Sequence, residues 1–503
     1  MSLFKEYPIS IFNSLTKEKE VFEPIIKDKV GMYVCGPTVY SDVHLGNVRT
    51  FMSFDIVFRY LKYLGYSVRY VRNITDVGHL VGDADEGEDK IAKKARLESL
   101  EPMEVVQKYT NGFHAVMRMF NILEPSIEPT ATGHIIEQIE FIKTIVKNGY
   151  AYETDGSVYF DVRKYHGDHE YGRLSGRNID DMLSNTRTLS GQDQKKDPLD
   201  FALWKKADKG HLMQWPSPWG NGFPGWHLEC SVMSTKYLGT TFDIHAGGMD
   251  LKFPHHEAEI AQNQGCCSKG GAKYWMHANM LTVEGRKMAK SEGNGFTPEQ
   301  LLTGNHKLLE KGYSAMTVRF FMLMSHYAST LDFSNEALQA AKKGYKRLMS
   351  ALKLVDKLPN PAKEQPDTTE NEALKAPIIK ALKDLSDDFN TAKAIASLFE
   401  MASKINTFYQ NPELIQKIDR KTFEWSMCHF KGIIKDVLGL QDETEEEGGT
   451  QVLDGVMKVV IDLRKQAKFS KDYALSDKIR NDLKEVGVQI KDEKDGGMSY
   501  TLD

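Results

Sequence analysis

The chain offers four widely separated side chains that are good metal ligands: Cys35, Cys230, His255 and Glu259. His255 and Glu259 stand four positions apart in the stretch FPHHEAEIAQ, a spacing that places both side chains on one face of a helix. Two thiolates, one imidazole and one carboxylate suit Zn²⁺ and suit Mg²⁺ poorly. These residue types therefore predict a zinc site assembled from distant parts of the chain.

A plainer interpretation of the same residues stays open. Buried cysteines often act as small apolar residues, and His255 with Glu259 would then be a pair on a helix surface. The chain has no Cys-x-x-Cys knuckle, and His256 is a second candidate for the imidazole ligand. The helix is not of the zincin type, because no histidine follows Glu257 at the position that His-Glu-x-x-His requires.

The stretch HLGN, residues 44–47, stands where a loop after a predicted strand leads into a predicted helix. The exposed N–H groups and the dipole of a helix start favour a phosphate. Gly46 allows a base or ribose to approach the backbone closely, and His44 and Asn47 can donate hydrogen bonds to phosphoryl oxygens. An ordinary helix N-terminus is the simpler alternative for a motif of four residues.

Two further stretches fit a nucleotide. KMAKS carries Lys287 and Lys290 between glycines, so a loop could close its lysines on a triphosphate, although surface lysines usually lie in solvent. In DIHAGGMD the backbone at Gly248 could approach an adenine, and Asp250 could bind ribose hydroxyls. A plain glycine turn is the alternative for this second stretch.

The elements that would hold these residues follow from periodicity. Residues 31–35 are apolar and β-prone, residues 44–64 have apolar positions at helical spacing, and residues 67–74 alternate as a strand does. Strand, helix and strand in this order make a βαβ unit, which predicts a parallel sheet. The strand pattern resumes at 241–250 and at 273–283.

The chain beyond residue 297 is predicted to be strongly helical, because its apolar residues form helical stripes. The stretch 442–450, DETEEEGGT, is acidic and contains two adjacent glycines, which is typical of a linker. The residues that follow it are predicted to form two helices and a short tail.

Composition limits the class of protein. The formal net charge of −5 argues mildly against blanket binding of nucleic acid, but it leaves room for local basic patches. Five cysteines, two of them adjacent, do not make a disulfide framework, so we expect a reducing, cytoplasmic location. No apolar run approaches the roughly 20 residues of a membrane helix, and the first residues do not read as a signal peptide.

The order of the motifs resembles the plan of the class I aminoacyl-tRNA synthetases: HLGN early, an insertion, a glycine-rich nucleotide loop, KMAKS and a helical C-terminal region. Cys35 before HLGN, together with GWHLEC and FPHHEAEIAQ, resembles the cysteinyl-tRNA synthetases in particular. One departure is the alanine in KMAKS, where the family usually has serine, although both lysines are present.

The resemblance implies ATP-dependent activation of L-cysteine to cysteinyl-adenylate, followed by transfer to the 3′-terminal adenosine of tRNA(Cys). It also implies one Zn²⁺ per chain, held by the four ligands above and selecting the substrate thiolate, with Mg²⁺ accompanying ATP. Thr75 and Trp226 would lie beside the amino-acid pocket. The catalytic residues would be His44, Asn47, Lys287 and Lys290. The ATP-binding residues would be His44, Gly46, Asn47, His245, Gly248, Asp250, Lys287 and Lys290.

The fold class that the pattern and the resemblance predict is α/β. It has a Rossmann-like parallel-sheet catalytic domain split by an α+β insertion, then an α-helical bundle and a small C-terminal domain. The expected segments are the first catalytic half (1–120), an inserted connective module (121–223), the second catalytic half (224–296), a stem-contact helical region (297–340), an anticodon-binding bundle (341–441), and a linker with the C-terminal domain (442–503).

Two other functions stay open at this point. A cysteine ligase with the same catalytic domain could pass its adenylate to an amino sugar, but such enzymes typically lack the roughly 200 residues that follow KMAKS here. A non-catalytic RNA-binding protein with a structural zinc would need neither HLGN nor the paired lysines. The expected partners are tRNA(Cys), ATP and L-cysteine, with no membrane, and a monomer is expected because members of the family are often monomers.

Overall fold

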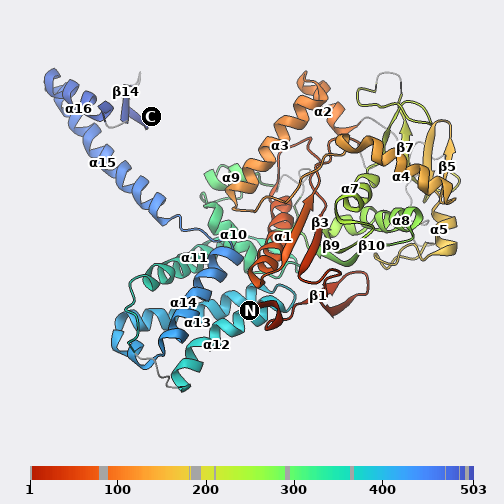
Figure 1. The fold of residues 1–503 in the computed structure, drawn as a ribbon. Helices are drawn as coiled ribbons and strands as arrows, with labels where there is room; N and C mark the ends of the chain where they lie inside the picture. The colour runs from red at the N-terminus through yellow and green to blue at the C-terminus, as the bar shows by residue number, and fades with distance from the viewer. Residues whose placement is uncertain are drawn as a thin grey trace. The chain divides into compact units, whose positions relative to one another are not determined.

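The structure is a computed structural model that describes residues 3–78, 89–179, 182, 194–208, 211–288, 295–362, 368–470, 472–485, 488–492 and 498–502. The chain divides into two compact units, Met1–Leu440 and Gln441–Asp503. Figure 1 traces both along the chain, from red at the N-terminus to blue at the C-terminus.

A parallel sheet with the strand order β10-β9-β3-β4 lies at the centre of the first unit (Figure 1). Most residues of this sheet are buried, and most of the buried ones are apolar, as expected for parallel strands that are covered on both faces. β3 and β9 are neighbours although a long insertion separates them in sequence, so the chain runs to opposite sides of the sheet from this point. Open α/β sheets bind ligands in the crevice beyond the carboxyl ends of two strands at which the chain direction divides in this way. The strands are β3 (Lys29–Val34), β4 (Ser67–Arg72), β9 (Thr241–Gly248) and β10 (Gly271–Ala278).

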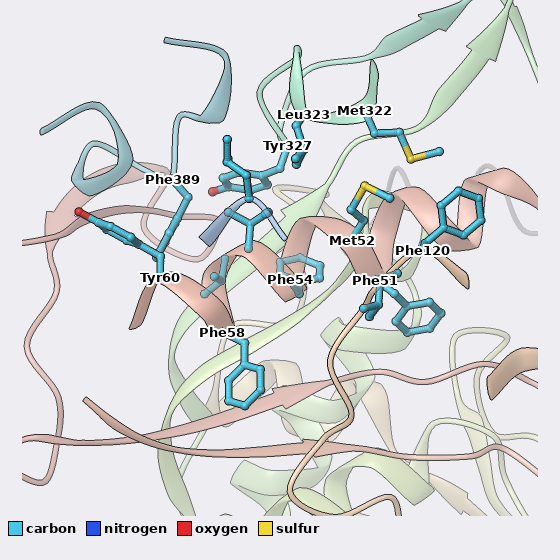
Figure 2. Packing of buried hydrophobic residues seen from close by; sticks show 14 of the residues in the cluster. Phe51, Met52, Phe54, Phe58, Tyr60, Phe120, Met322, Leu323, Tyr327 and Phe389 are labelled. Atoms are coloured by element: carbon cyan, nitrogen blue, oxygen red, sulfur yellow. The ribbon is translucent and has the colours of Figure 1, made fainter. Parts of the chain in front are cut away.

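Helix α1 (Leu45–Leu64) connects β3 to β4, which confirms the predicted βαβ unit. A capping box begins the helix: the N–H of Asn47 donates to Nδ1 of His44 at 3.3 Å, and the N–H of His44 donates to Oδ1 of Asn47 at 3.2 Å. Gly65 ends it in the left-handed conformation, with φ 101°. Its apolar residues pack against the end of α10 (Ala315–Leu323), as Figure 2 shows around Met52 and Leu323.

Buried charges connect α1 to distant parts of this unit. The carboxylate of Asp55 accepts hydrogen bonds from Arg59 Nε at 2.8 Å, from Arg319 Nη2 at 2.6 Å and from the N–H of Leu123 at 2.9 Å. Arg319, which is fully buried, also donates to the carbonyl oxygen of Leu438 at 2.7 Å. The helix that carries HLGN at its start is therefore held to α10 by a buried ion pair, and Arg319 extends this contact to the backbone at Leu438.

The insertion contains an antiparallel sheet with the order β5-β6-β7-β8, and its helices bury a separate apolar cluster. Two helices beside the central sheet, α7 and α8, contribute residues to the same cluster, so the insertion rests on the elements that carry the predicted metal ligands. The α+β character predicted for this part is confirmed. The elements are α4 (Ile135–Lys147), β5 (Ala151–Thr154), β6 (Ser157–Phe160), α5 (Val162–Asp168), β7 (Phe201–Lys206), β8 (Gly222–Pro224), α7 (Leu228–Leu238) and α8 (His255–Cys267).

Helices dominate the rest of the first unit, as predicted. One difference is that the strand expected over 273–283 is broken, so that its last part, β11 (Leu281–Val283), leaves the central sheet and pairs with β12 (Arg286–Lys287) and β13 (Leu331–Phe333). The helices are α9 (Pro298–Thr303), α10, α11 (Asn335–Val355), α12 (Thr368–Ser386), α13 (Thr391–Gln410) and α14 (Arg420–Gly432), followed by a π-helical turn, η8 (Ile433–Val437). The remaining elements before the insertion are η1 (Leu3–Lys5), β1 (Ser10–Asn13), β2 (Glu18–Val21), α2 (Lys90–Glu98) and α3 (Pro102–Met119). Within the insertion η3 (Thr132–His134) precedes α4, and in the helical region η7 (Pro412–Lys417) follows α13.

The structure of the second unit differs from the prediction at two places. Helix α15 (Thr444–Phe469) begins inside the stretch 442–450 that was predicted to be a linker. Glutamate favours helix, and negative charge is stabilised at a helix start, so the acidic run extends the helix. After α16 (Tyr473–Glu485) the predicted tail is a hairpin of β14 (Val488–Asp492) and β15 (Met498–Leu502). None of the described helices has both the length and the apolar character that a membrane span requires.

Candidate functional site

The four predicted metal ligands come together beyond the carboxyl end of β3, and all four are buried. The sulfur atoms of Cys35 and Cys230 are 3.5 Å apart, and Nε2 of His255 lies 3.4 Å from the sulfur of Cys230. Oε1 of Glu259 lies 3.5 Å from the sulfur of Cys35 and 3.4 Å from Nε2 of His255. Zinc bonds of the usual length in a tetrahedron place their donors about 3.3–3.8 Å apart, so the spacing fits such an ion.

Each ligand is fixed by a different element. Cys35 follows β3 and its N–H donates to the carbonyl oxygen of Ala246 in β9 at 3.0 Å. Cys230 lies in the first turn of α7, as the stretch GWHLEC predicted. His255 and Glu259 lie in the first turns of α8, and their i, i+4 spacing brings both to the same side of that helix.

The chemistry of the donor set also favours a cation. Burial raises the pKa of the Cys35 thiol well above its usual value, and burial raises the pKa of Cys230 to about 12. Oε2 of Glu259 is buried and has no hydrogen-bond partner in the described part of the chain. A soft divalent cation would satisfy the carboxylate and hold both sulfurs as thiolates, so the residues present fit a metal site.

Two further imidazoles lie close to the sulfur of Cys35. Nε2 of His256 lies 3.3 Å and Nε2 of His245 lies 3.4 Å from the sulfur of Cys35. With Glu259 and Cys35 these two histidines form a second possible set of four ligands. Nδ1 of His256 is engaged with Nε2 of His277 at 2.9 Å. His245 was expected among the ATP-binding residues, but it is buried against Cys35 and stacks on the ring of Trp275.

A cavity of about 710 Å³ joins the metal ligands to the nucleotide motif. Cys35, Cys230 and His255 line it, whereas Glu259, His245 and His256 do not. The helix start of α1 lines the same cavity through His44, Gly46 and Asn47. The predicted site residues that line the cavity are Cys35, His44, Gly46, Asn47, Thr75, Trp226, Cys230, Gly248, Asp250 and His255.

The lysines of KMAKS are only partly described. Lys290 lies outside the described residues, and for Lys287 the backbone alone is described: it lies in β12 and pairs with Thr282 of the antiparallel strand β11. On either side of the loop, Met288 and Gly295 line the cavity. The described residues that flank 289–294 therefore lie beside the site that the lysines were predicted to serve.

Sequence reasoning missed two buried residues at this site. Oε1 of Glu229 accepts a hydrogen bond from the hydroxyl of Thr75, and burial raises the pKa of the Glu229 carboxyl well above its usual value. Oδ1 of Asn73 accepts from the N–H of Gly36 at 2.8 Å and lies 3.7 Å from the sulfur of Cys230. The only signal in the sequence is adjacency, since Glu229 precedes a predicted ligand and Asn73 is the penultimate residue of the strand predicted over 67–74.

Comparison with known proteins shows the family and the fold of the chain. Residues 21–343 match the family of tRNA synthetases class I (C), catalytic domain, and residues 382–440 match the DALR domain. The chain is 54% identical to a cysteine–tRNA ligase of Bacteroides fragilis over 98% of both chains. It is 46% identical to a cysteine–tRNA ligase of Deinococcus radiodurans over 97% of this chain and 96% of that protein.

Solved structures show the same fold at low identity. The methionyl-tRNA synthetase of Mycobacterium tuberculosis, in complex with methionyl-adenylate, superposes with a TM-score of 0.59 at 14% identity. The match covers 82% of this chain and 92% of the other. The relatives that match nearly end to end do not support the alternative of an amino-sugar ligase. Together with the catalytic-domain match, they show that the chain belongs to the cysteine–tRNA ligase family of class I tRNA synthetases.

Proposed function

We propose that the chain activates L-cysteine with ATP and transfers it to tRNA(Cys), and that its buried cluster of cysteine, histidine and glutamate selects the substrate by its sulfur. The observation that carries the proposal is the shared cavity: three of the metal ligands and the HLGN helix start line one space. A substrate bound at its sulfur by the metal centre would present its carboxylate to a nucleotide held at the start of α1.

The metal that the donors fit is Zn²⁺, held by Cys35, Cys230, His255 and Glu259. His255 is proposed as the imidazole ligand in preference to His256, because His255 faces the cavity and His256 is engaged with His277 behind it. When bound, the ion would supply a soft Lewis acid that takes sulfur as a ligand and lowers the pKa of a thiol. His245 then has a supporting position behind Cys35, instead of the contact with ATP expected from the resemblance.

Thiolate binding explains how cysteine is told from serine. Differences of shape between near-isosteres are worth only about 1–3 kcal/mol in a pocket. A serine hydroxyl is harder to deprotonate and is a poorer partner for a soft centre. A site that recognises sulfur chemically gives larger discrimination, so the inserted module need not edit mistakes and is proposed to contact the acceptor end of tRNA or to be structural.

The first step is attack of a carboxylate oxygen of cysteine on the α-phosphorus of ATP, with pyrophosphate leaving. His44 and Asn47 would hydrogen-bond the phosphoryl oxygens, and Lys287 and Lys290 would stabilise the negative charge on the β- and γ-phosphates. Mg²⁺ is proposed to accompany the nucleotide. The backbone at Gly248 would approach the adenine, and Asp250 would bind the ribose. Positioning and electrostatics supply this catalysis, since no protein nucleophile is needed.

The second step is attack of a terminal ribose hydroxyl of tRNA, by class I analogy the 2′-OH, on the carbonyl carbon of the adenylate, with AMP leaving. Residues 297–340 are proposed to contact the tRNA stem and residues 341–441 to bind the anticodon. A cytoplasmic monomer is proposed from the cysteine content and the family resemblance.

ATP–pyrophosphate exchange and charging of a tRNA with a GCA anticodon test this function. Both should depend on L-cysteine. Exchange without charging of this tRNA would favour a different acceptor, and the absence of cysteine-dependent exchange would contradict the proposal.

A further inference from the structure

Glu229 is a buried carboxylate at the cavity with one oxygen unused. It lies in the first turn of α7, directly before Cys230, and only 2% of it is exposed. Glu229 lines the cavity, and its Oε1 accepts the hydroxyl hydrogen of Thr75 at 2.5 Å. Oε2 has no hydrogen-bond partner within the described ranges. A buried polar atom without a partner is costly, so this oxygen points to a ligand that supplies a donor.

The position of Glu229 is fixed by a chain of hydrogen bonds. Nδ2 of Asn73 donates to the hydroxyl oxygen of Thr75 at 3.1 Å, and Thr75 in turn donates to Glu229. The hydroxyl of Thr75 has one hydrogen, which goes to Glu229, and two lone pairs, of which Asn73 uses one. The second lone pair of Thr75 and Oε2 of Glu229 are thus two unused acceptors on neighbouring residues, both of which line the cavity.

The other carboxylates near the cavity do not offer the same site. Along the described part of its lining, the acidic residues are Asp42, Asp250 and Glu229, and the first two are exposed. Asp76 follows Thr75 in the sequence and is also buried, but both its oxygens accept hydrogen bonds from Thr132. Glu229 is therefore the lining carboxylate that is both desolvated and incompletely satisfied.

The substrate carries the complementary group. In L-cysteine, two carbon atoms separate the sulfur from the α-ammonium nitrogen. Asn73 connects the two places, because its amide lies 3.7 Å from the sulfur of Cys230 and 3.1 Å from the hydroxyl of Thr75, which donates to Glu229. A substrate sulfur held beside Cys230 therefore keeps that nitrogen within reach of Thr75 and Glu229, which line the same cavity. The geometry points to Glu229 as the residue that binds the α-ammonium of cysteine, with Thr75 as the second acceptor; this inference rests on the proposed binding of the substrate sulfur at the metal centre.

The consequence is selectivity among thiols. A thiol whose amine is absent or acylated would leave Oε2 of Glu229 buried without a cation, and sites built to pair with a charged group reject analogues that lack it. The metal centre recognises the sulfur, and Glu229 recognises the free amine. Together they distinguish free cysteine from thiols whose amine is acylated.

Binding of two small thiols to the full chain, with Co²⁺ in place of Zn²⁺, tests this without any catalytic step. Cysteamine has a thiol and an ammonium, and 2-mercaptoethanol replaces that ammonium by a neutral hydroxyl. The sulfur-to-cobalt charge-transfer absorption reports each titration. The wild-type chain should bind cysteamine at least about tenfold more tightly, since a hydrogen bond to a charged group is worth that factor or more.

Glu229→Gln should reduce this preference to less than about threefold, because the amide keeps the shape and can still accept from Thr75 but carries no charge. Glu229→Asp keeps the charge one methylene further away, so its preference should fall between the two. Asp42→Asn, which removes an exposed carboxylate from elsewhere in the cavity, should leave the preference as in the wild type. In the exchange assay Glu229→Gln should raise KM for cysteine and leave KM for ATP unchanged.

An undiminished preference for cysteamine in Glu229→Gln, or in Glu229→Asp if the first variant does not retain cobalt, would overturn the assignment of Glu229. If neither thiol changes the spectrum of the wild-type chain, sulfur does not bind the metal. The proposed sulfur recognition would then be overturned, and the inference with it. The two failures are therefore distinguishable in one set of titrations.

Discussion

The sulfur atoms of Cys35 and Cys230 lie 3.5 Å apart although 195 positions separate the two residues in the sequence. The parallel pairing of β3 with β9 brings the two halves of the catalytic sheet together around the insertion. The metal site therefore exists only when this sheet is formed, so metal binding is coupled to the folded state.

Replacing one sulfur tests the role of the cluster. Cys230→Ser should lower the metal content below one ion per chain and raise KM for cysteine at least about tenfold, because a ligand has been lost. Metal analysis and exchange kinetics measure both quantities. Cys428→Ser, which changes an exposed cysteine, should leave them as in the wild type. A Cys230→Ser chain that retains both metal and cysteine affinity would rule out sulfur selection by this cluster.

The metal-free chain should lose stability as the pH rises from about 9 to about 12. Burial raises the pKa of Cys230 from 9.0 to about 12 in the folded chain, so the unfolded chain loses this proton first. Above pH 9 the unfolded state then binds fewer protons than the folded state, and the free energy of unfolding falls as the pH rises. Urea unfolding of chelator-treated protein across this range measures the slope.

Cys230→Ala separates this thiol from the tyrosines that titrate in the same range. Its unfolding free energy should fall less steeply with pH than that of the wild type. Equal slopes in the two proteins would show that Cys230 is not held neutral by burial. In the metal-loaded chain the dependence at lower pH is opposite: metal affinity should fall as the pH is lowered, because protons compete for the sulfurs.

Gly36 should not tolerate a side chain. A Cβ at this position would lie 1.6 Å from the backbone oxygen of Asn73, so the loop after Cys35 would have to move. Gly36→Ala should cost about 1–3 kcal/mol of unfolding free energy and should also lower metal content. Gly112→Ala is the matched control: it lies on helix α3 with nothing within 4 Å, and should stabilise the chain by about 0.5–1 kcal/mol. A Gly36→Ala chain with wild-type stability and full metal content would contradict this account of the loop.

The buried charges around Asp55 should matter far more than ion pairs on the surface. Asp55→Asn leaves Arg59 and Arg319 buried without their counter-charge, which should cost about 3–5 kcal/mol in urea unfolding. Glu400→Gln breaks the exposed pair with Lys380 and should cost less than about 1 kcal/mol. Similar losses in the two variants would mean that Arg59 and Arg319 are solvated or paired elsewhere when Asp55 is neutralised.

Local patterns predicted the elements that hold the site. The period of apolar residues over 44–64 gave α1, and the alternation over 67–74 gave β4, because both elements bury a regular face. The i, i+4 spacing of His255 and Glu259 needed only a helix to bring the two side chains together. The order of motifs, compared with a known family, then identified which cysteines belonged with them.

The remaining features depend on contacts that no local pattern shows. His245, His256 and His277 lie behind the cluster because two neighbouring strands and one helix meet there, and sequence spacing gave no reason to group them. Glu229 reads as an ordinary acidic residue of a helix start until α7 is placed against the end of β3 and the loop that carries Thr75. The stretch 442–450 is predicted to be a linker although α15 begins within it, because acidic residues are common both in linkers and at helix starts.

The central claim is that a metal-bound sulfur selects the substrate. The most direct test is ATP–pyrophosphate exchange with cysteine and with serine on one purified sample, together with metal analysis of that sample. The account predicts about one zinc ion per chain, rapid exchange with cysteine and exchange with serine weaker by more than about a thousandfold. A sample that contains no transition metal and still prefers cysteine to the same degree would contradict it.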